Sequence, residues 1–190
     1  MLTLEYQNTQ EVYKMAKVIV CYAHGGTTGD PGCLSADKKI KERDYIKAFI
    51  DEVFLPALTK KGREYKTIQQ QTWYTIDKQV NAAYKPGDMW ISFHLNASDN
   101  NEATGTETLC SKGSKNGSKL AILVNDAVVK TIGIKNRGIK EITREDRGGR
   151  LVAGTTPPAV LTELFFLTNT NDYKLANPKL SEIGTAVAEA

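Results

Sequence analysis

The chain alternates short, strongly apolar segments with amphipathic ones, and this alternation limits its possible folds more than any other feature. Residues 17–23 (KVIVCYA) are rich in β-branched side chains and lead into the turn HGG, which is the pattern of a buried strand with an abrupt end. From residue 39 apolar side chains recur at three- and four-residue spacing until Gly62, as in an amphipathic helix. Because strands that alternate with helices form parallel sheets, we expect an α/β fold: a single domain with a twisted, mostly parallel sheet covered by helices on both faces.

The rest of the chain fits the same pattern. Further strands are predicted at residues 64–70, 89–93, 105–110 and 157–169, and further helices at residues 75–84, 118–132 and 173–190. No repeat, low-complexity tract or linker divides the sequence, whereas the first strand starts only after residue 16. We therefore predict an N-terminal extension at residues 1–16 and one compact domain at residues 17–190.

The charged and apolar residues exclude several kinds of partner. The 25 basic and 22 acidic residues give a net charge of +3 and are spread along the chain, so no dense basic tract indicates nucleic-acid binding. No stretch approaches the ~18 consecutive apolar residues of a membrane span, and the N-terminus lacks the apolar core of a signal peptide. We expect a monomer that is made in the cytoplasm, binds no nucleic acid and does not insert into a membrane.

Polar side chains stand where three of the predicted strands end. His24 follows the first strand, His94 follows the strand at residues 89–93, and Glu163 ends the apolar run at residues 159–162. In an open α/β sheet, ligands bind in the crevice beyond the carboxyl ends of the parallel strands. Glu42 lies on the inward face at the start of the first helix, from where it can reach the same crevice. The sequence therefore predicts that two histidines and two carboxylates meet at one edge of the sheet.

These residue types suit a catalytic zinc site. Two imidazoles and one carboxylate, with a fourth position left for water, form a common ligand set of catalytic zinc. The metal lowers the pKa of its water toward ~7, and a second carboxylate that does not ligate can then take and return a proton. The two histidines are the only ones in the chain, so one metal site accounts for both.

Six ordered motifs resemble one family of cell-wall enzymes. They are VIVCYAHGGTTGDPGC, KERDY, DMWISFHLNAS, GTETLC, NRGIK and PPAVLTELFFLTN. In this order they are similar to the zinc-dependent N-acetylmuramoyl-L-alanine amidases, the family of bacterial autolysins and phage endolysins that cut peptidoglycan. The resemblance extends from about residue 17 to the end of the chain, so it implies that residues 17–190 are a zinc amidase catalytic domain.

The resemblance also implies a role for each of the four polar residues. The two zinc histidines of the family correspond to His24 and His94, and its glutamate ligand corresponds to Glu42. Its catalytic glutamate corresponds to Glu163. Glu52, ten residues after Glu42 on the same predicted helix, is the alternative ligand and would lie almost two turns further from the strand ends.

Three departures from the family pattern accompany this match. Family members carry an arginine after the second strand and another in the next helix, where this chain has the glutamine-rich IQQQ and DKQVNAA. The family glycine two residues after the catalytic glutamate is Phe165 here.

Cys33, close to the first histidine in the sequence, is expected to be a free thiol and not a ligand.

The expected reaction is hydrolysis of the amide between N-acetylmuramic acid and L-alanine, with bacterial peptidoglycan as the substrate and Zn²⁺ as the cofactor. His24, Glu42 and His94 would hold the metal, and Glu163 would act as general base and then acid. Asn96 is a candidate for hydrogen bonding to the peptide stem, or alternatively for stabilising a turn. Two other functions stay open: a zinc peptidase that cuts within the stem peptide, and a wall-binding module without activity.

Overall fold

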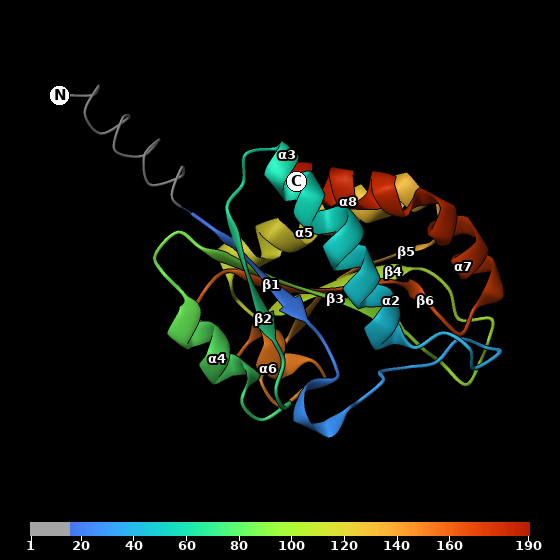
Figure 1. Cartoon of the computed structure of the whole chain (residues 1–190), viewed down its shortest axis with the longest axis horizontal. Coiled ribbons are helices and arrows are strands. Elements are labelled where there is room, and N and C mark those ends of the chain that lie inside the picture. Colours follow the sequence, from blue (N-terminus) through green and yellow to red (C-terminus); the bar gives the residue numbers. More distant parts are fainter. Residues whose placement is uncertain (1–15) are drawn as a thin grey trace.

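The computed structural model describes residues 16–190, so the predicted N-terminal extension lies outside the described residues except for Ala16. The strands are β1 (Val18–Tyr22), β2 (Tyr65–Gln69), β3 (Met89–Asn96), β4 (Thr106–Ser111), β5 (Asn136–Ile142) and β6 (Ala159–Phe166). The helices are η1 (Gly26–Thr28), α2 (Glu42–Phe49), η2 (Ile50–Phe54), α3 (Leu55–Lys60), α4 (Ile76–Ala83), α5 (Lys115–Ile132), α6 (Gly149–Val152), α7 (Thr170–Ala176), η3 (Asn177–Lys179) and α8 (Leu180–Glu189). One sheet lies between two helical layers (Figure 1), which confirms the predicted single-domain α/β class.

The sheet contains six strands in the order β2-β1-β3-β6-β4-β5. The first four strands in this order are parallel to one another, whereas β4 pairs with β6 in the antiparallel sense and β5 pairs with β4 in parallel. The amino end of β4 therefore lies at the same edge of the sheet as the carboxyl ends of β1, β3 and β6. This edge carries the candidate site.

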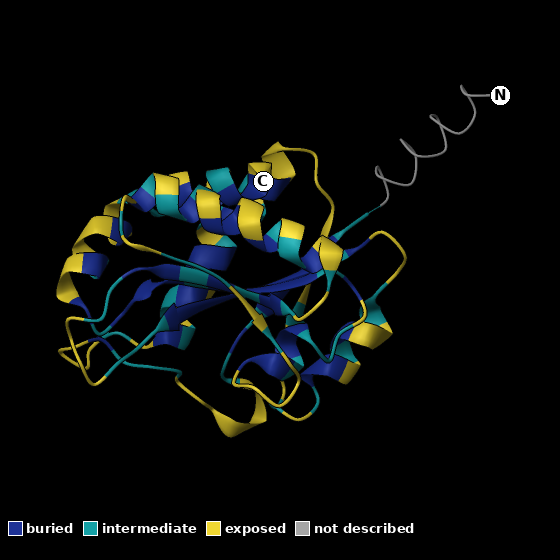
Figure 2. Cartoon of the chain, turned by 180° about the vertical axis from the view of Figure 1, so that it is seen from behind, coloured by how far each residue is buried: buried dark blue, intermediate teal, exposed yellow. Residues whose placement is uncertain are grey.

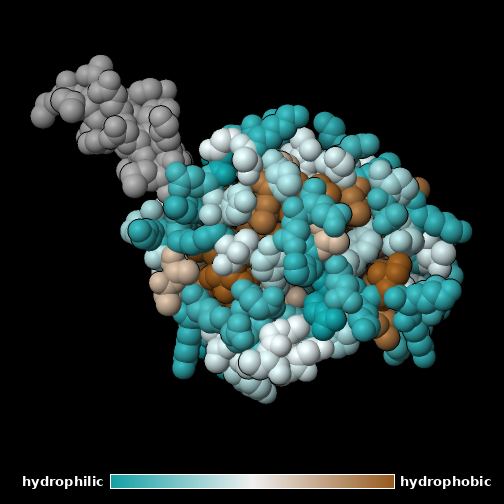
Figure 3. Space-filling view, in the orientation of Figure 1, coloured by the Kyte–Doolittle hydropathy of each residue, from teal (hydrophilic) through white to brown (hydrophobic). Residues whose placement is uncertain are grey.

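The period-2 alternation of the buried strands explains the two helical layers. Val18 and Val20 of β1 pack against α2, α3, α5 and α8, whereas Ile19 and Cys21 pack on the opposite face with residues of α4 and α6. Figure 2 shows the strands buried between helices whose outer faces are exposed. Because α4 has eight residues and α6 only four, this second layer leaves part of its sheet face uncovered. Figure 3 shows separate apolar areas on a mostly hydrophilic surface.

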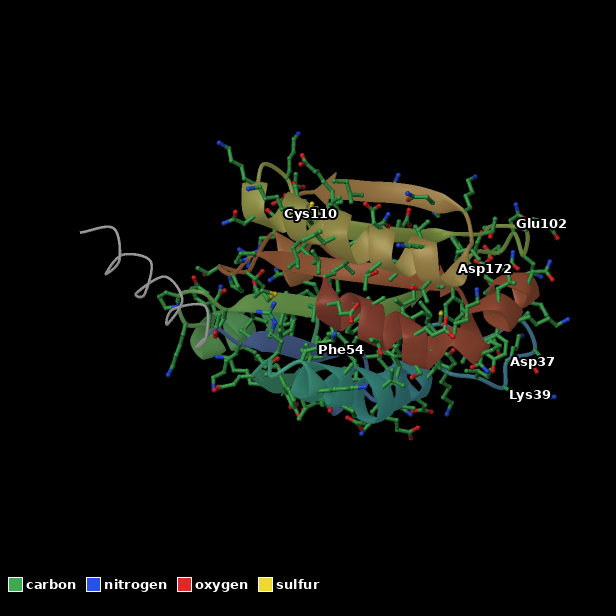
Figure 4. The ribbon with its side chains drawn as sticks, turned by 90° about the horizontal axis from the view of Figure 1, so that it is seen from above. Asp37, Lys39, Phe54, Glu102, Cys110 and Asp172 are labelled. Carbon is green, nitrogen blue, oxygen red and sulfur yellow. The ribbon has the colours of Figure 1, made fainter. Side chains whose placement is uncertain are left out.

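A cluster of aromatic side chains packs the helix that contains α2 and η2 against the sheet. The ring centroid of Phe93 on β3 lies 5.1 Å from that of Phe49 on α2 and 4.7 Å from that of Phe54 on η2, which is labelled in Figure 4. Each such edge-to-face pair contributes about 0.5–1.5 kcal/mol beyond area burial. The helix changes to π geometry at η2, directly before Pro56, which lacks the amide hydrogen that an α-helical ladder would need there.

Two parts of the fold differ from the prediction. The strand β5 was not predicted, because it is a largely exposed edge strand without apolar alternation. The predicted closing helix at residues 173–190 is wrong as a single helix: α7, η3 and α8 replace it, with the break at Pro178.

Among residues 16–190, no helix combines the length and the apolar character that a membrane crossing requires.

Candidate active site

His24 lies in a tight turn directly after β1. Its φ of 61° is left-handed, which is unusual for a residue with a side chain and often marks a functional constraint. The side chain of Gln69 holds this turn, since its Nε2 donates to the carbonyl oxygens of Tyr22 at 3.0 Å and His24 at 2.8 Å. At Gly26 a Cβ would lie 2.3 Å from the carbonyl oxygen of Gln70, so only glycine fits against β2 there.

Glu42, the first residue of α2, is 3% exposed and reaches the two histidines. Its Oε1 lies 2.9 Å from His24 Nε2 and 3.0 Å from His94 Nδ1. Backbone amides fix the carboxylate, because Leu95 N donates to Oε1 and Cys33 N donates to Oε2. Burial alone would raise the pKa of Glu42, but the close polar contacts and the charges of both histidines outweigh it and hold the pKa well below its usual value.

His94 is 8% exposed and lies near the carboxyl end of β3. Its ring meets that of His24 edge to face, with 5.0 Å between the centroids. Each imidazole also contacts a second group through its other nitrogen: His24 Nδ1 lies 2.8 Å from Asp30 Oδ2, and His94 Nε2 lies 3.1 Å from Ser92 Oγ. Such contacts fix the orientation of a histidine that serves as a ligand.

These three side chains could together hold a metal ion. One nitrogen from each histidine and one oxygen of Glu42 all lie within 4.8 Å of one another. His24 Nε2 is buried and makes no hydrogen bond of acceptable geometry with any of residues 16–190, although it faces the Glu42 carboxylate. A cation between these atoms would give both His24 Nε2 and the Glu42 carboxylate a favourable partner. The alternative ligand Glu52 is exposed on η2 and is not part of this cluster.

Glu163 lies on β6 beside the histidine cluster. It pairs with His94 across β3 and with Glu107 across β4. Its Oε2 is buried without a hydrogen-bond partner in the described part of the chain. Burial, and then the charges of Glu42 and Glu107, raise its pKa to about 8, which suits a group that exchanges protons near neutral pH.

Glu107 is a member of the site that the sequence analysis missed. Asn96 Nδ2 donates to its Oε1 at 2.8 Å, and Arg137 Nε donates to its Oε2 at 3.0 Å. The signal was present in the alternation of GTETLC, which places Glu107 on the same half-buried face as Leu109. The amide of Asn96, the candidate for substrate binding, is thus engaged with Glu107 and, through its Oδ1, with the backbone amide of Ala97.

The carboxylates and histidines line a cavity of about 320 Å³ on the uncovered face of the sheet. Arg147 and Trp73 also line it, as does Cys33, whose Sγ donates to the Leu95 carbonyl at 3.3 Å. Burial, then the charge of Glu42, raises the pKa of the Cys33 thiol, which disfavours the thiolate that a ligand or nucleophile needs. A second cavity of about 380 Å³ adjoins the first and shares His24, Trp73 and His94 with it.

A comparison with known families decides the affiliation of this chain. The family model described as N-acetylmuramoyl-L-alanine amidase matches residues 18–190. The chain belongs to this family. The match includes all four polar residues of the candidate site, and it agrees with the resemblance seen in the sequence motifs.

Individual relatives are distant. N-acetylmuramoyl-L-alanine amidase LytC of Bacillus subtilis is 29% identical over 104 residues, which is 53% of this chain and 20% of the relative. The probable cell wall amidase LytH of Staphylococcus epidermidis is 27% identical over 164 residues, 86% of this chain and 52% of the relative. The chain thus spans about a fifth of the length of LytC and about half of the length of LytH.

Solved structures share the fold. An N-acetylmuramoyl-L-alanine amidase from Clostridium difficile 630 superposes with a TM-score of 0.75 at 23% identity, covering 92% of this chain and 93% of the other. The catalytic domain of the CD27L endolysin, whose target is Clostridia difficile, superposes with a TM-score of 0.70 at 26% identity, covering 92% and 95%.

The departures from the family pattern have local explanations. Phe165 is fully buried and packs edge to face on Tyr45, with 5.9 Å between ring centroids, so it joins β6 to α2. Glutamines of the segments IQQQ and DKQVNAA tie β2 to its neighbours: Gln69 holds the His24 turn, and Gln79 Nε2 donates to the Gln69 carbonyl at 3.2 Å.

Proposed function

We propose that the protein is a zinc-dependent N-acetylmuramoyl-L-alanine amidase that hydrolyses the amide between N-acetylmuramic acid and L-alanine in bacterial peptidoglycan. The observation that carries this proposal is the convergence of His24, Glu42 and His94 beside Glu163 in one cavity of a chain from this family. Two nitrogens and one carboxylate oxygen match the ligands that catalytic zinc uses.

Each residue has a distinct part in the reaction. His24 and His94 would bind the metal through Nε2 and Nδ1, and Glu42 through Oε1, while Asp30 and Ser92 keep the imidazoles oriented. Bound zinc would polarise the amide carbonyl and acidify a water molecule. Glu163 would accept the proton of the attacking water on its unpartnered Oε2 and return it to the leaving amine of L-alanine. Burial and the neighbouring carboxylates raise its pKa in the metal-free protein, which favours the protonated form that returns the proton to the amine.

We further propose that the protein acts on the cell wall, as the name of the probable cell wall amidase LytH indicates for that relative. Digestion of purified sacculi followed by mass spectrometry tests the reaction. An amidase releases stem peptides with a free N-terminal L-alanine, whereas a peptidase would cut within the stem. A wall-binding module without activity would bind sacculi and release no amino group.

Metal analysis tests the cofactor. The purified protein should bind about one zinc ion per chain, and a chelator should abolish hydrolysis. Glu42→Gln should lose most of the zinc, whereas Glu52→Gln, on the exposed side of the same helix, should keep it. Full activity in metal-free protein would contradict the proposal.

A further inference from the structure

The second cavity differs in chemistry from the catalytic one. Its lining includes two aromatic residues, Trp73 and Tyr74, and the uncharged polar side chains of Thr28, Gln70, Gln71 and Thr72. Among the residues that the structure describes, no lysine or arginine lines it and the one carboxylate in its lining, Asp30, is engaged with His24. The catalytic cavity instead contains Arg147, which has no ion-pair partner among residues 16–190.

Tyr74 and Gln70 have features that a folded core does not explain. Tyr74 is 73% exposed, and Arg150 lies over its ring at 5.7 Å from the centroid, so the phenol is held in place at the surface. Gln70 is only 8% exposed, yet its Oε1 has no hydrogen-bond partner among the described residues. A buried amide oxygen without a partner is unfavourable unless a water molecule or a ligand donates to it.

The two ends of the proposed substrate differ in charge, as the linings of the two cavities do. On one side of the scissile amide is an acetamido sugar without charge, which offers apolar ring faces, hydroxyl groups and an acetamido N–H. On the other side is a peptide that carries carboxylates. Aromatic faces and amide oxygens suit the sugar, whereas an unpaired guanidinium suits a carboxylate.

We propose that the cavity of Gln70, Trp73 and Tyr74 is the glycan subsite and that Arg147 marks the peptide side, so that the substrate crosses the site from the second cavity to the first. This inference rests on the proposed function and assigns a direction to it. Tyr74 stacks on a sugar ring, Gln70 accepts from the acetamido N–H, and Trp73 lies at the boundary between the two subsites.

Tryptophan fluorescence reports on this subsite without catalysis. The chain has two tryptophans, and Trp90 is fully buried with its Nε1 bonded to the Leu151 carbonyl, so a sugar at the surface can perturb only Trp73. We expect a linear N-acetylglucosamine tetramer to change the emission saturably in both metal-free and zinc-loaded protein. Tyr74→Ala should weaken this binding roughly three- to tenfold.

Two further variants complete the test. Tyr65→Ala removes another exposed tyrosine at the far end of β2 from Gln69 and should leave tetramer binding unchanged. Arg147→Gln should also leave tetramer binding unchanged but weaken competitive inhibition of hydrolysis by a free L-alanyl stem tripeptide. The proposal is wrong if the tetramer has no effect on Trp73, if Tyr74→Ala and Tyr65→Ala behave alike, or if Arg147→Gln weakens tetramer binding instead.

The outcomes separate this inference from the proposed function. A protein that releases stems with N-terminal L-alanine but does not bind the tetramer retains the proposed function and loses the glycan subsite. A protein that binds the tetramer through Tyr74 but releases no amino group retains the subsite and loses the amidase function.

Discussion

Glu107 and Glu163 lie directly opposite each other in the antiparallel register of β4 and β6. The two carboxylates have different surroundings, because Arg137 and Asn96 occupy both oxygens of Glu107 while Glu163 Oε2 is buried without a partner among residues 16–190. Burial, together with the charges of Glu42 and Glu107, raises the pKa of Glu163 to about 8. A neighbouring pair whose environments differ in this way separates a fixed charge from a proton carrier.

Glu163→Gln should therefore keep the fold and the zinc but lose most of the turnover. Glutamine has the shape of glutamate and cannot carry the proton, so kcat should fall by ~10²–10⁴-fold. Release of N-terminal L-alanine measures the loss, and metal analysis verifies the zinc content. Glu52→Gln is the matched control on an exposed position and should be unaffected. Hydrolysis at the normal rate by Glu163→Gln would assign the proton transfer to another residue.

Glu107→Gln should shift the pH profile without removing activity. The charge of Glu107 contributes to the raised pKa of Glu163, so its removal should lower that pKa. Because a general base works in its deprotonated form, the acidic limb of kcat/KM should move to lower pH. Glu141→Gln, on the exposed edge strand β5, is the control and should leave the limb in place. A shift to higher pH would contradict this account of Glu163.

The sequence predicts the centre of this site better than its surroundings. Buried strands that end in a polar residue are visible in the alternation, so His24 and His94 could be assigned to one edge of the sheet. The pairing of β4 against β6 depends on tertiary packing, and no local pattern reveals it. Without that pairing, Glu107 could not be placed beside Glu163, and the engaged amide of Asn96 could not be foreseen.

Gly32→Ala should weaken zinc binding by displacing two ligands. A Cβ at this position would lie 2.7 Å from Glu42 Oε2 and 2.9 Å from His24 Cδ2. Gly29 has a similar left-handed φ, +66° against +69°, but a Cβ there has no atom within 4 Å. Both alanine variants should lose about 1–2 kcal/mol of stability through backbone strain. Only Gly32→Ala should lose zinc affinity, by ~10–100-fold in competition with a metal indicator; equal affinities in the two variants would contradict the prediction.

Zinc binding should release a proton from His24, and this release should depend on pH. Burial alone would lower the pKa of His24, but the close contacts and charges of Glu42 and Asp30 raise it to about 9 in the metal-free protein. Since this pKa lies above the ordinary value of 6.5, the protonated histidine stabilises the metal-free fold fully below pH 6.5, and the contribution is lost as the pH rises through 9. A ligand nitrogen must be free of its proton, so zinc competes with that proton at neutral pH.

Calorimetry in buffers of different ionisation enthalpy measures this exchange. At pH 7.5 we expect about one proton from His24 for each zinc bound, and a much smaller release at pH 10, where the imidazole is already neutral. The apparent zinc affinity should therefore rise with pH up to about 9. Asp30→Asn removes one of the charges that raise the pKa of His24, so it should reduce the proton release at pH 7.5. A zinc-binding enthalpy that is the same in every buffer at pH 7.5 would show that His24 is neutral before the metal binds.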